Sequence, residues 1–151
     1  MSKIAKTILT CYTTIPTIVK KIDKQVYNSA VTSHNLTYGY ARCDAYGQMK
    51  AIAELIEKKS ELLELFNVAK DALSKLDKLS RRLLVSKYIT QLSLEQMLKD
   101  SKLPQTTLYR YLSQAISKFA SSLIVDGYDE NWFLSTYLKQ NWIKKVYNKQ
   151  Q

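Results

Sequence analysis

The chain has 151 residues, of which 46% are hydrophobic and 24% are charged, and it contains only three glycines and two prolines. This length suits one compact domain, or a small domain with an appendage, and the hydrophobic content is sufficient for a core, so the composition excludes a disordered tail. The 23 basic and 13 acidic residues give a formal charge of +10, which attracts polyanions such as nucleic acid or anionic lipid headgroups.

The two cysteines, Cys11 and Cys43, have neither CxxC spacing nor neighbouring histidines. We therefore expect two reduced thiols in a cytoplasmic protein, with no metal and no cofactor. Lys3 and Lys6 precede a short apolar run, as in an export signal, but threonines interrupt that run, so we expect no export. No window approaches the roughly 18 apolar residues that span a bilayer, so we expect no membrane partner.

Apolar residues recur at spacings of three and four along most of the chain, which predicts an all-α protein with little or no sheet. The first predicted helix runs from Ile15 to about Ser33, because Ile15, Val19, Ile22 and Val26 follow this spacing. Pro16 lies in its first turn, where proline is tolerated. Residues 34–47 contain two glycines and have no clear period, so we predict a loop there, with the single histidine, His34, as an ordinary polar loop residue.

A long helix is predicted from Gln48 to about Leu73, with apolar residues at the core positions of a seven-residue repeat. These core positions are Met49, Ile52, Ile56, Leu63, Phe66 and Leu73. Leu55, Leu62 and Leu65 widen the apolar face and leave room for a partner. Residues 1–72 are therefore predicted to form a helical hairpin, and two uses of the long helix stay open: packing within the chain, or a coiled coil in a homodimer.

Three further helices are predicted in residues 73–123, over Leu73 to Ile89, Ser93 to Ser101 and Gln105 to Leu123. Ser93 and Gln96 have the spacing of a capping box that opens the second of these helices. The segment 75–123 carries nine basic and three acidic residues, the largest positive excess in the chain.

The helix predicted over Gln105 to Leu123 separates an apolar face from a polar one. Leu108, Leu112, Ala115 and Phe119 follow helical spacing and are expected to pack against the two preceding helices. The opposite face carries hydrogen-bonding groups and one formal charge, a composition suited to reading base edges in a major groove. The expected base-facing residues are Gln105, Thr106, Tyr109, Arg110 and Ser113, with Ser117 farther along the same face.

A family resemblance is carried by five stretches of the segment 79–119, namely Leu79 to Leu84, Tyr88, Leu92 to Met97, Thr107 to Tyr111 and Gln114 to Phe119. Over about 45 of its 151 residues the chain resembles region 4 of sigma-70-type factors, and it is more similar still to short phage-encoded regulators of the ArpU and RinA sort. Lys102 stands where glycine is common in this family, so the resemblance implies a left-handed backbone there, which costs a residue with a side chain about 1 kcal/mol. The resemblance implies a helix-turn-helix module that binds double-stranded DNA in transcriptional control, with RNA polymerase as a further partner. Its phosphate contacts would come from Arg81, Arg82, Lys87, Lys102 and the helix start at Thr107.

Residues 124–151 are predicted to turn around Asp126 and Gly127 and to end in a short amphipathic helix. The apolar groups of this tail are Trp132, Phe133, Tyr137, Trp142, Ile143, Val146 and Tyr147. They fit two uses, packing back onto the domain or binding another protein.

We expect no catalytic residues, because no phosphate loop, paired carboxylates or nucleophile motif is present, and hence no enzyme. Two alternatives to a DNA-binding regulator stay open. One is a helical adaptor that binds RNA polymerase or another protein without touching DNA. The other is a phage DNA-packaging subunit, which would combine a helix-turn-helix with an oligomerising helix.

Overall fold

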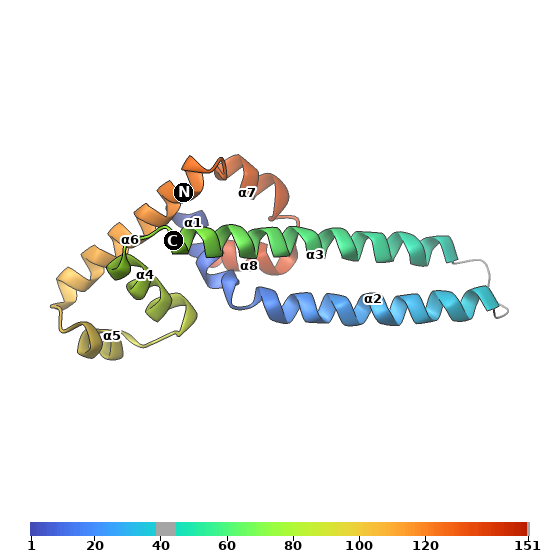
Figure 1. Ribbon diagram of the computed structural model, residues 1–151, viewed down its shortest axis with the longest axis horizontal. Helices are drawn as coiled ribbons and strands as arrows, with labels where there is room; N and C mark the ends of the chain where they lie inside the picture. The colour runs from blue at the N-terminus through green and yellow to red at the C-terminus, as the bar shows by residue number, and fades with distance from the viewer. Residues whose placement is uncertain (39–44, 151) are drawn as a thin grey trace. The chain divides into compact units, whose positions relative to one another are not determined.

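The computed structural model describes the backbone of residues 1–38 and 45–150 and the side chains of residues 1–31 and 46–150 (Figure 1). Every regular element in these ranges is helical, which confirms the predicted all-α class. The chain divides into two compact units, one of Met1–Thr13 with Leu65–Gln151 and one of Thr14–Glu64. This division replaces the predicted segments 1–72, 73–123 and 124–151, because both ends of the chain belong to the same unit as the segment 73–123.

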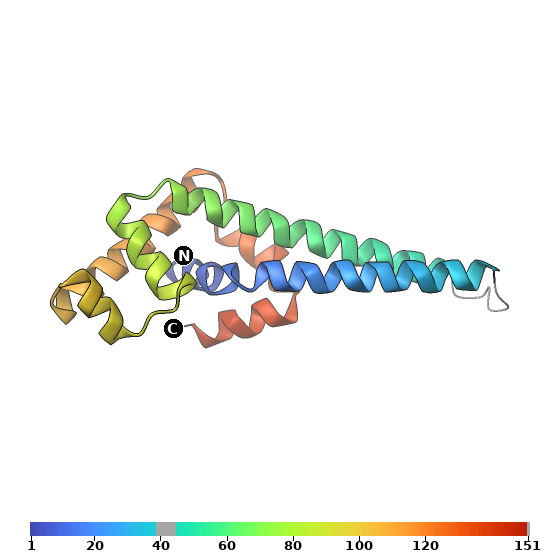
Figure 2. The ribbon, with the colours of Figure 1, turned by 60° about the horizontal axis from the view of Figure 1, so that its bottom comes forward.

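The unit Thr14–Glu64 consists of α2 (Ile15–Tyr38) and most of α3 (Ala45–Ser74), which run side by side in both views of the ribbon (Figures 1 and 2). Ile15 and Ile22 of α2 are buried and Val19 and Val26 are half-buried, as their spacing predicts. The predicted loop over 34–47 is wrong for 34–38 and 45–47, which are helical, and Cys43 and the rest of that loop lie outside the described residues. The side chain of His34 also lies outside them.

The structure covers half of the predicted core positions of α3, since Ile52 and Phe66 are half-buried and Leu73 is buried. The covered or half-covered residues of α3 in this unit are Gln48, Ile52, Leu55, Lys59, Glu61 and Leu62. Lys59 joins α3 to α2 through an ion pair with Asp23, at 2.6 Å between Nζ and Oδ1. Met49, Ile56 and Leu63 are 65%, 53% and 40% exposed, so three predicted core positions lie on the surface. Leu55 and Leu62, expected to leave room for a partner, instead face inward.

The other unit begins with α1 (Ser2–Tyr12), a helix that the sequence analysis did not predict. Its apolar residues Ile4, Ile8 and Leu9 are almost fully buried, and the helix packs against α6 and α8. The threonines that interrupt the apolar run do not prevent this burial, because Thr7 and Thr10 donate hydrogen bonds to the carbonyls of Lys3 and Lys6. A hydroxyl that bonds one turn back in its own helix brings no unpaired polar group into the core.

The same unit contains the end of α3 and all the remaining helices. They are α4 (Lys78–Leu84), a π-helical segment η1 (Val85–Ile89), α5 (Leu94–Ser101), α6 (Gln105–Val125), α7 (Glu130–Thr136) and α8 (Asn141–Lys149). The predicted helix from Leu73 to Ile89 is therefore interrupted at its start, because α3 ends at Ser74 and α4 begins after Asp77. Phe133, Tyr137 and Ile143 of the tail are fully buried, so the tail packs back within its own unit.

Candidate nucleic-acid interface

The start of α4 is fixed by Asp77, whose carboxylate accepts a hydrogen bond from the backbone N–H of Ser80 at 3.2 Å. An aspartate at this position satisfies a helix-start donor and interacts favourably with the helix dipole. Lys118 of α6 donates to the same carboxylate at 3.0 Å, which ties α6 to the start of α4. These hydrogen bonds hold the pKa of Asp77 well below its usual range, with the bonds from Ser80 and Lys118 as the main causes.

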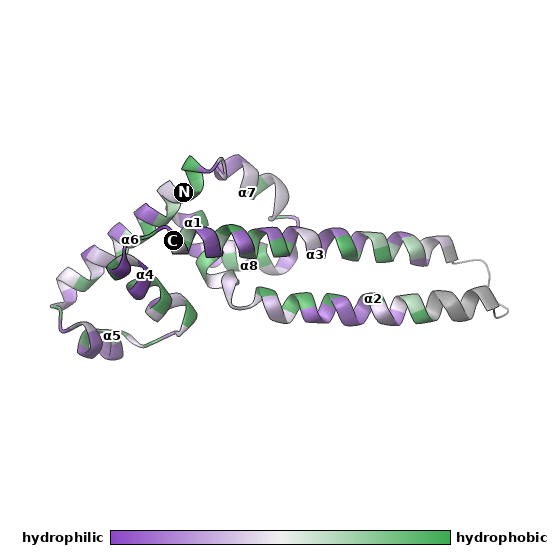
Figure 3. Ribbon diagram, in the orientation of Figure 1, coloured by the Kyte–Doolittle hydropathy of each residue, from purple (hydrophilic) through white to green (hydrophobic). Residues whose placement is uncertain are grey.

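A small hydrophobic cluster holds α4, α5 and α6 together. It consists of the buried side chains of Leu83, Met97, Leu108 and Leu112. Leu92, Leu94, Leu98 and Tyr111 pack around it and are partly buried. One face of α6 is committed to this cluster, so its opposite face is left to solvent. The alternation of hydrophobic and hydrophilic residues along α6 is visible in Figure 3.

The connection from α5 to α6 is a three-residue turn whose ends are well defined. Ser93 and Gln96 form the predicted capping box: the Ser93 hydroxyl accepts from Gln96 N at 3.3 Å, and the Gln96 amide accepts from Ser93 N at 3.0 Å. Lys102 has φ 57° and ψ 24°, the predicted left-handed backbone. Pro104, which has no N–H to leave unpaired, precedes the first residue of α6.

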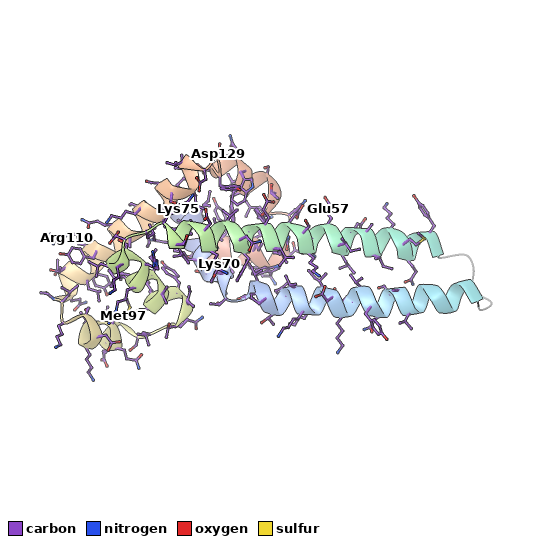
Figure 4. All side chains as sticks on the ribbon, viewed as in Figure 1. Glu57, Lys70, Lys75, Met97, Arg110 and Asp129 are labelled. Carbon is purple, nitrogen blue, oxygen red and sulfur yellow. The ribbon has the colours of Figure 1, made fainter. Side chains whose placement is uncertain are left out.

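All five residues predicted to face bases are exposed on α6. Helical spacing places Thr106, Arg110 and Ser117 at the centre of the outer face, directly opposite the buried Leu108 and Leu112. Arg110 projects from α6 in Figure 4, and its guanidinium lies 5.4 Å from the centre of the Tyr111 ring. The remaining members occupy the start and the rim of this face: Gln105 lies in the first turn, and Tyr109 and Ser113 lie on the side facing α1.

The predicted phosphate contacts divide into two groups. Arg82, Lys87 and Lys102 are exposed and Thr107 is half-buried in the first turn of α6. Arg81 is a correction, because its guanidinium already donates to three backbone carbonyls, those of Leu73 at 3.0 Å, Ser74 at 2.8 Å and Leu76 at 2.9 Å. These carbonyls lie at the end of α3 and in the following turn, where a helix leaves acceptors unpaired. Arg81 therefore joins α4 to α3 rather than facing a ligand.

Two residues that the sequence analysis did not assign to the site, Ser2 and Lys6 of α1, lie beside the outer face of α6. They line a hollow of about 160 Å³ together with Lys87 of η1 and four residues of α6, namely Tyr109, Leu112, Ser113 and Ile116. Partial burial and, second, the neighbouring charge of Lys6 lower the pKa of Lys87. Ile4 and Ile8, with Lys6 between them, have the spacing of a helix with one apolar face. This pattern assigns Lys6 to the site only when residues 2–12 are recognised as a helix.

Comparisons with protein-family models, with curated proteins and with solved structures find no match to this chain.

In the part of the chain that the structure describes, no three His, Cys, Asp or Glu residues group together in a way that could hold a metal ion. Within the same ranges, none of the helices is both long enough and apolar enough to cross a membrane. Cys11 is buried, and this burial raises the pKa of its thiol to about 12. The described surface of α6 carries exposed hydrogen-bonding side chains, and two lysines, Lys6 and Lys87, lie beside it.

Proposed function

We propose that α4, α5 and α6 form a helix-turn-helix motif, and that the protein is a DNA-binding regulator of transcription. In this proposal α6 enters the major groove of double-stranded DNA and α5 lies across the groove. The observation that carries the proposal is the exposed outer face of α6, where Thr106, Arg110 and Ser113 offer hydrogen-bonding groups around a single charge. Two cations from other elements, Lys6 of α1 and Lys87 of η1, line a hollow at the rim of this face, together with Tyr109 and Ser113.

The chemistry of this face suits the reading of bases, because an arginine can donate two hydrogen bonds to guanine and the short hydroxyl side chains can bond either partner of a base pair. Arg82, Lys87 and Lys102 come from α4, η1 and the turn before α6, and we propose that they bind backbone phosphates. The resemblance to region 4 of sigma factors supports RNA polymerase as a second partner. The fully buried tail residues Phe133, Tyr137 and Ile143 offer little to an adaptor that would bind protein alone.

Selection from random double-stranded DNA, followed by a salt titration on the retained fragment, tests the proposal. Arg110→Ala should cost about 1–3 kcal/mol on the selected sequence and little on random DNA, because a base contact contributes only at its own base pair. Lys58→Ala removes the same charge from an exposed position on α3 and should change neither affinity. An affinity that does not fall log-linearly with salt, or equal losses for Arg110→Ala on both DNAs, would count against the proposal.

We also propose that the exposed stripe of α3 pairs with the same stripe of a second copy. Met49, Ile56 and Leu63 recur every seven residues, with Ala53 and Ser60 between them, which is the spacing of a coiled-coil seam. In an antiparallel pair centred near Ala53 and Ile56, Lys50 of each copy would lie opposite Glu57 of the other, so the flanking charges are complementary. Sedimentation equilibrium should show a weak dimer that Ile56→Lys abolishes and that Leu79→Lys, another exposed apolar position, leaves intact.

A further inference from the structure

The hollow between α1, η1 and α6 is lined by basic side chains and hydroxyl groups above an apolar part of α6. Lys6 and Lys87 bring two positive charges from different elements, and Ser2, Tyr109 and Ser113 bring three hydroxyl groups. None of the described residues that line it is acidic. Leu112 and Ile116, which belong to the buried face of α6, supply its apolar lining.

The two lysines are held near each other by packing rather than by attraction. The buried residues on either side of Lys6 fix α1 against α6 and η1, and this packing carries Lys6 toward Lys87. Like charges in a partly desolvated place repel, and the lowered pKa of Lys87 reflects both its burial and the charge of Lys6. A bound anion would relieve this repulsion, so the hollow favours a negatively charged ligand.

The donors around the hollow are those that phosphate oxygens prefer, namely ammonium groups and hydroxyls that can each donate one hydrogen bond. The hollow is also adjacent to the outer face of α6, because Tyr109 and Ser113 belong to both. A duplex whose major groove received α6 would have a sugar-phosphate strand along each side of that helix, and one of these strands would pass over α1.

We propose that this hollow is a phosphate-binding site in which Lys6, Lys87 and the hydroxyls of Ser2 and Ser113 hold one phosphodiester of the bound DNA. The claim that the phosphate belongs to DNA rests on the proposed function. The claim that the hollow binds phosphate does not. The proposal moves Tyr109 and Ser113 from base-facing to phosphate-facing residues, and leaves base reading to Gln105, Thr106 and Arg110. It also gives α1 a direct part in binding.

The first measurement uses inorganic phosphate and no DNA. Phosphate replaces chloride at constant ionic strength, and thermal unfolding is followed together with the backbone amide NMR shifts of Lys87 and Ser113. The wild-type chain should show a higher Tm in phosphate and shifts at both amides, and a Lys6→Gln/Lys87→Gln variant should show neither. Lys24→Gln/Lys58→Gln, which removes one exposed charge from α2 and one from α3, is the matched control and should respond as the wild type does. Circular dichroism verifies that each variant is folded.

The second measurement is the salt dependence of binding to random and selected DNA. The logarithm of the binding constant falls linearly with the logarithm of the salt concentration. Losing one phosphate contact should make this slope less steep by about 0.9, which corresponds to about an eightfold weaker affinity at 0.1 M salt. The Lys6→Gln/Lys87→Gln variant should show this loss equally on both DNAs, and Lys6→Arg/Lys87→Arg should largely restore it.

The two measurements separate the outcomes. If Lys6→Gln/Lys87→Gln loses the response to phosphate but keeps the wild-type salt slope, the hollow binds free phosphate and does not bind a phosphodiester of DNA. If the wild-type chain responds to phosphate at these amides but retains no DNA, the proposed function fails and the hollow still binds phosphate. A variant that matches the wild type in both measurements overturns the phosphate site itself.

Discussion

Three described residues have a left-handed backbone. Gln91 has no part in the proposed site, so a substitution there tests how much this backbone conformation costs in stability. Gln91 and Lys102 both have φ 57°, and Gly127 has φ 88°. Gln91→Gly should stabilise the chain by about 0.5–1 kcal/mol, because relief of the left-handed strain exceeds the entropy that glycine adds to the unfolded state. Gly127→Ala should destabilise it by about 1–2 kcal/mol. Its added methyl group would meet nothing within 4 Å, so this loss would report backbone strain alone. Urea unfolding measures both changes, and a Gln91→Gly variant less stable than the wild type would contradict the argument.

Neighbouring arginines, Arg81 and Arg82, should respond differently to the same substitution. Arg81→Ala removes three hydrogen bonds to carbonyls of the α3 end and should lower the free energy of unfolding by about 1–2 kcal/mol. Arg82→Ala should leave stability within about 0.5 kcal/mol, because its side chain is exposed, and should weaken DNA binding on all sequences alike. Chemical unfolding and a binding titration on each variant test the pair. Equal stabilities would mean that the carbonyl contacts contribute nothing.

These two arginines also show where reasoning from sequence stops at the scale of single residues. Both lie in a basic run that predicts phosphate binding, and their local sequence does not separate them. The difference arises because α3 ends at Ser74, a position that places three backbone carbonyls within reach of the Arg81 guanidinium. In contrast, the Ser93 capping box could be predicted from local spacing, because it depends on the backbone within a few residues, and the left-handed backbone at Lys102 followed from the family resemblance.

At the scale of elements, the cap at the start of α4 should make the free energy of unfolding depend on pH in the acidic range. Hydrogen bonds from Ser80 and Lys118 lower the pKa of Asp77 in the folded state, so its stabilising effect is complete above the ordinary value of 3.8 and disappears as pH falls below it. Asp77→Asn should keep part of the helix cap and lose the ionic contribution. The stability difference between wild type and Asp77→Asn, measured by urea unfolding, should therefore be larger at pH 7 than at pH 2.5. A difference independent of pH would contradict this account.

The two apolar stripes of α3 predict opposite results for adjacent leucines. Leu62 is fully buried and Leu63 is 40% exposed. Leu62→Ala should cost about 2–4 kcal/mol because it leaves a cavity, whereas Leu63→Ala should cost less than about 1 kcal/mol in the monomer. Urea unfolding at low protein concentration measures both losses without a contribution from any dimer. A larger loss for Leu63→Ala would mean that Leu63 is a core residue, as the sequence predicted.

Half of the predicted stripe of α3 lies on the surface for a physical reason. Met49, Ile56 and Leu63 continue the apolar repeat of the covered Ile52, Phe66 and Leu73, whereas the side that faces inward also contains Gln48 and Lys59. A polar residue can lie on an inward face when a partner element supplies a charge, as Asp23 does for Lys59 at 2.6 Å. Periodicity alone identifies the helix and its two candidate faces, and the choice between them depends on contacts from a different helix.

At the scale of the whole molecule, the sequence predicted the helical class, the order of the helices in 73–123 and the outer face of α6, and it missed α1. The missing helix matters most because it packs against α6 and α8 and supplies two residues of the proposed phosphate site. Its sequence alternates lysines and threonines with apolar residues and has no start signal, since no side chain caps its first turn. Burial against distant segments, rather than local preference, is what makes residues 2–12 helical.

Cys11, near the end of α1, makes the integrity of this packing measurable. Its side chain is buried, and burial raises the pKa of the thiol to about 12, against an ordinary value of 9.0. Because the thiolate is the reactive form, the folded protein should be almost inert to a thiol reagent at pH 8, and labelling should require α1 to leave its site. In a Cys43→Ser background, the labelling rate should therefore give the free energy of opening.

If α1 belongs to one cooperative unit with α6, that free energy should equal the one from urea unfolding, and Ile8→Ala should lower both by the same amount. Leu63→Ala, on the exposed stripe of α3, should leave the labelling rate nearly unchanged. Fast labelling of the wild-type chain under conditions where α6 stays folded would mean that α1 detaches on its own. The hollow beside Tyr109 would then form only while α1 is docked, and phosphate should slow the labelling in proportion to its occupancy.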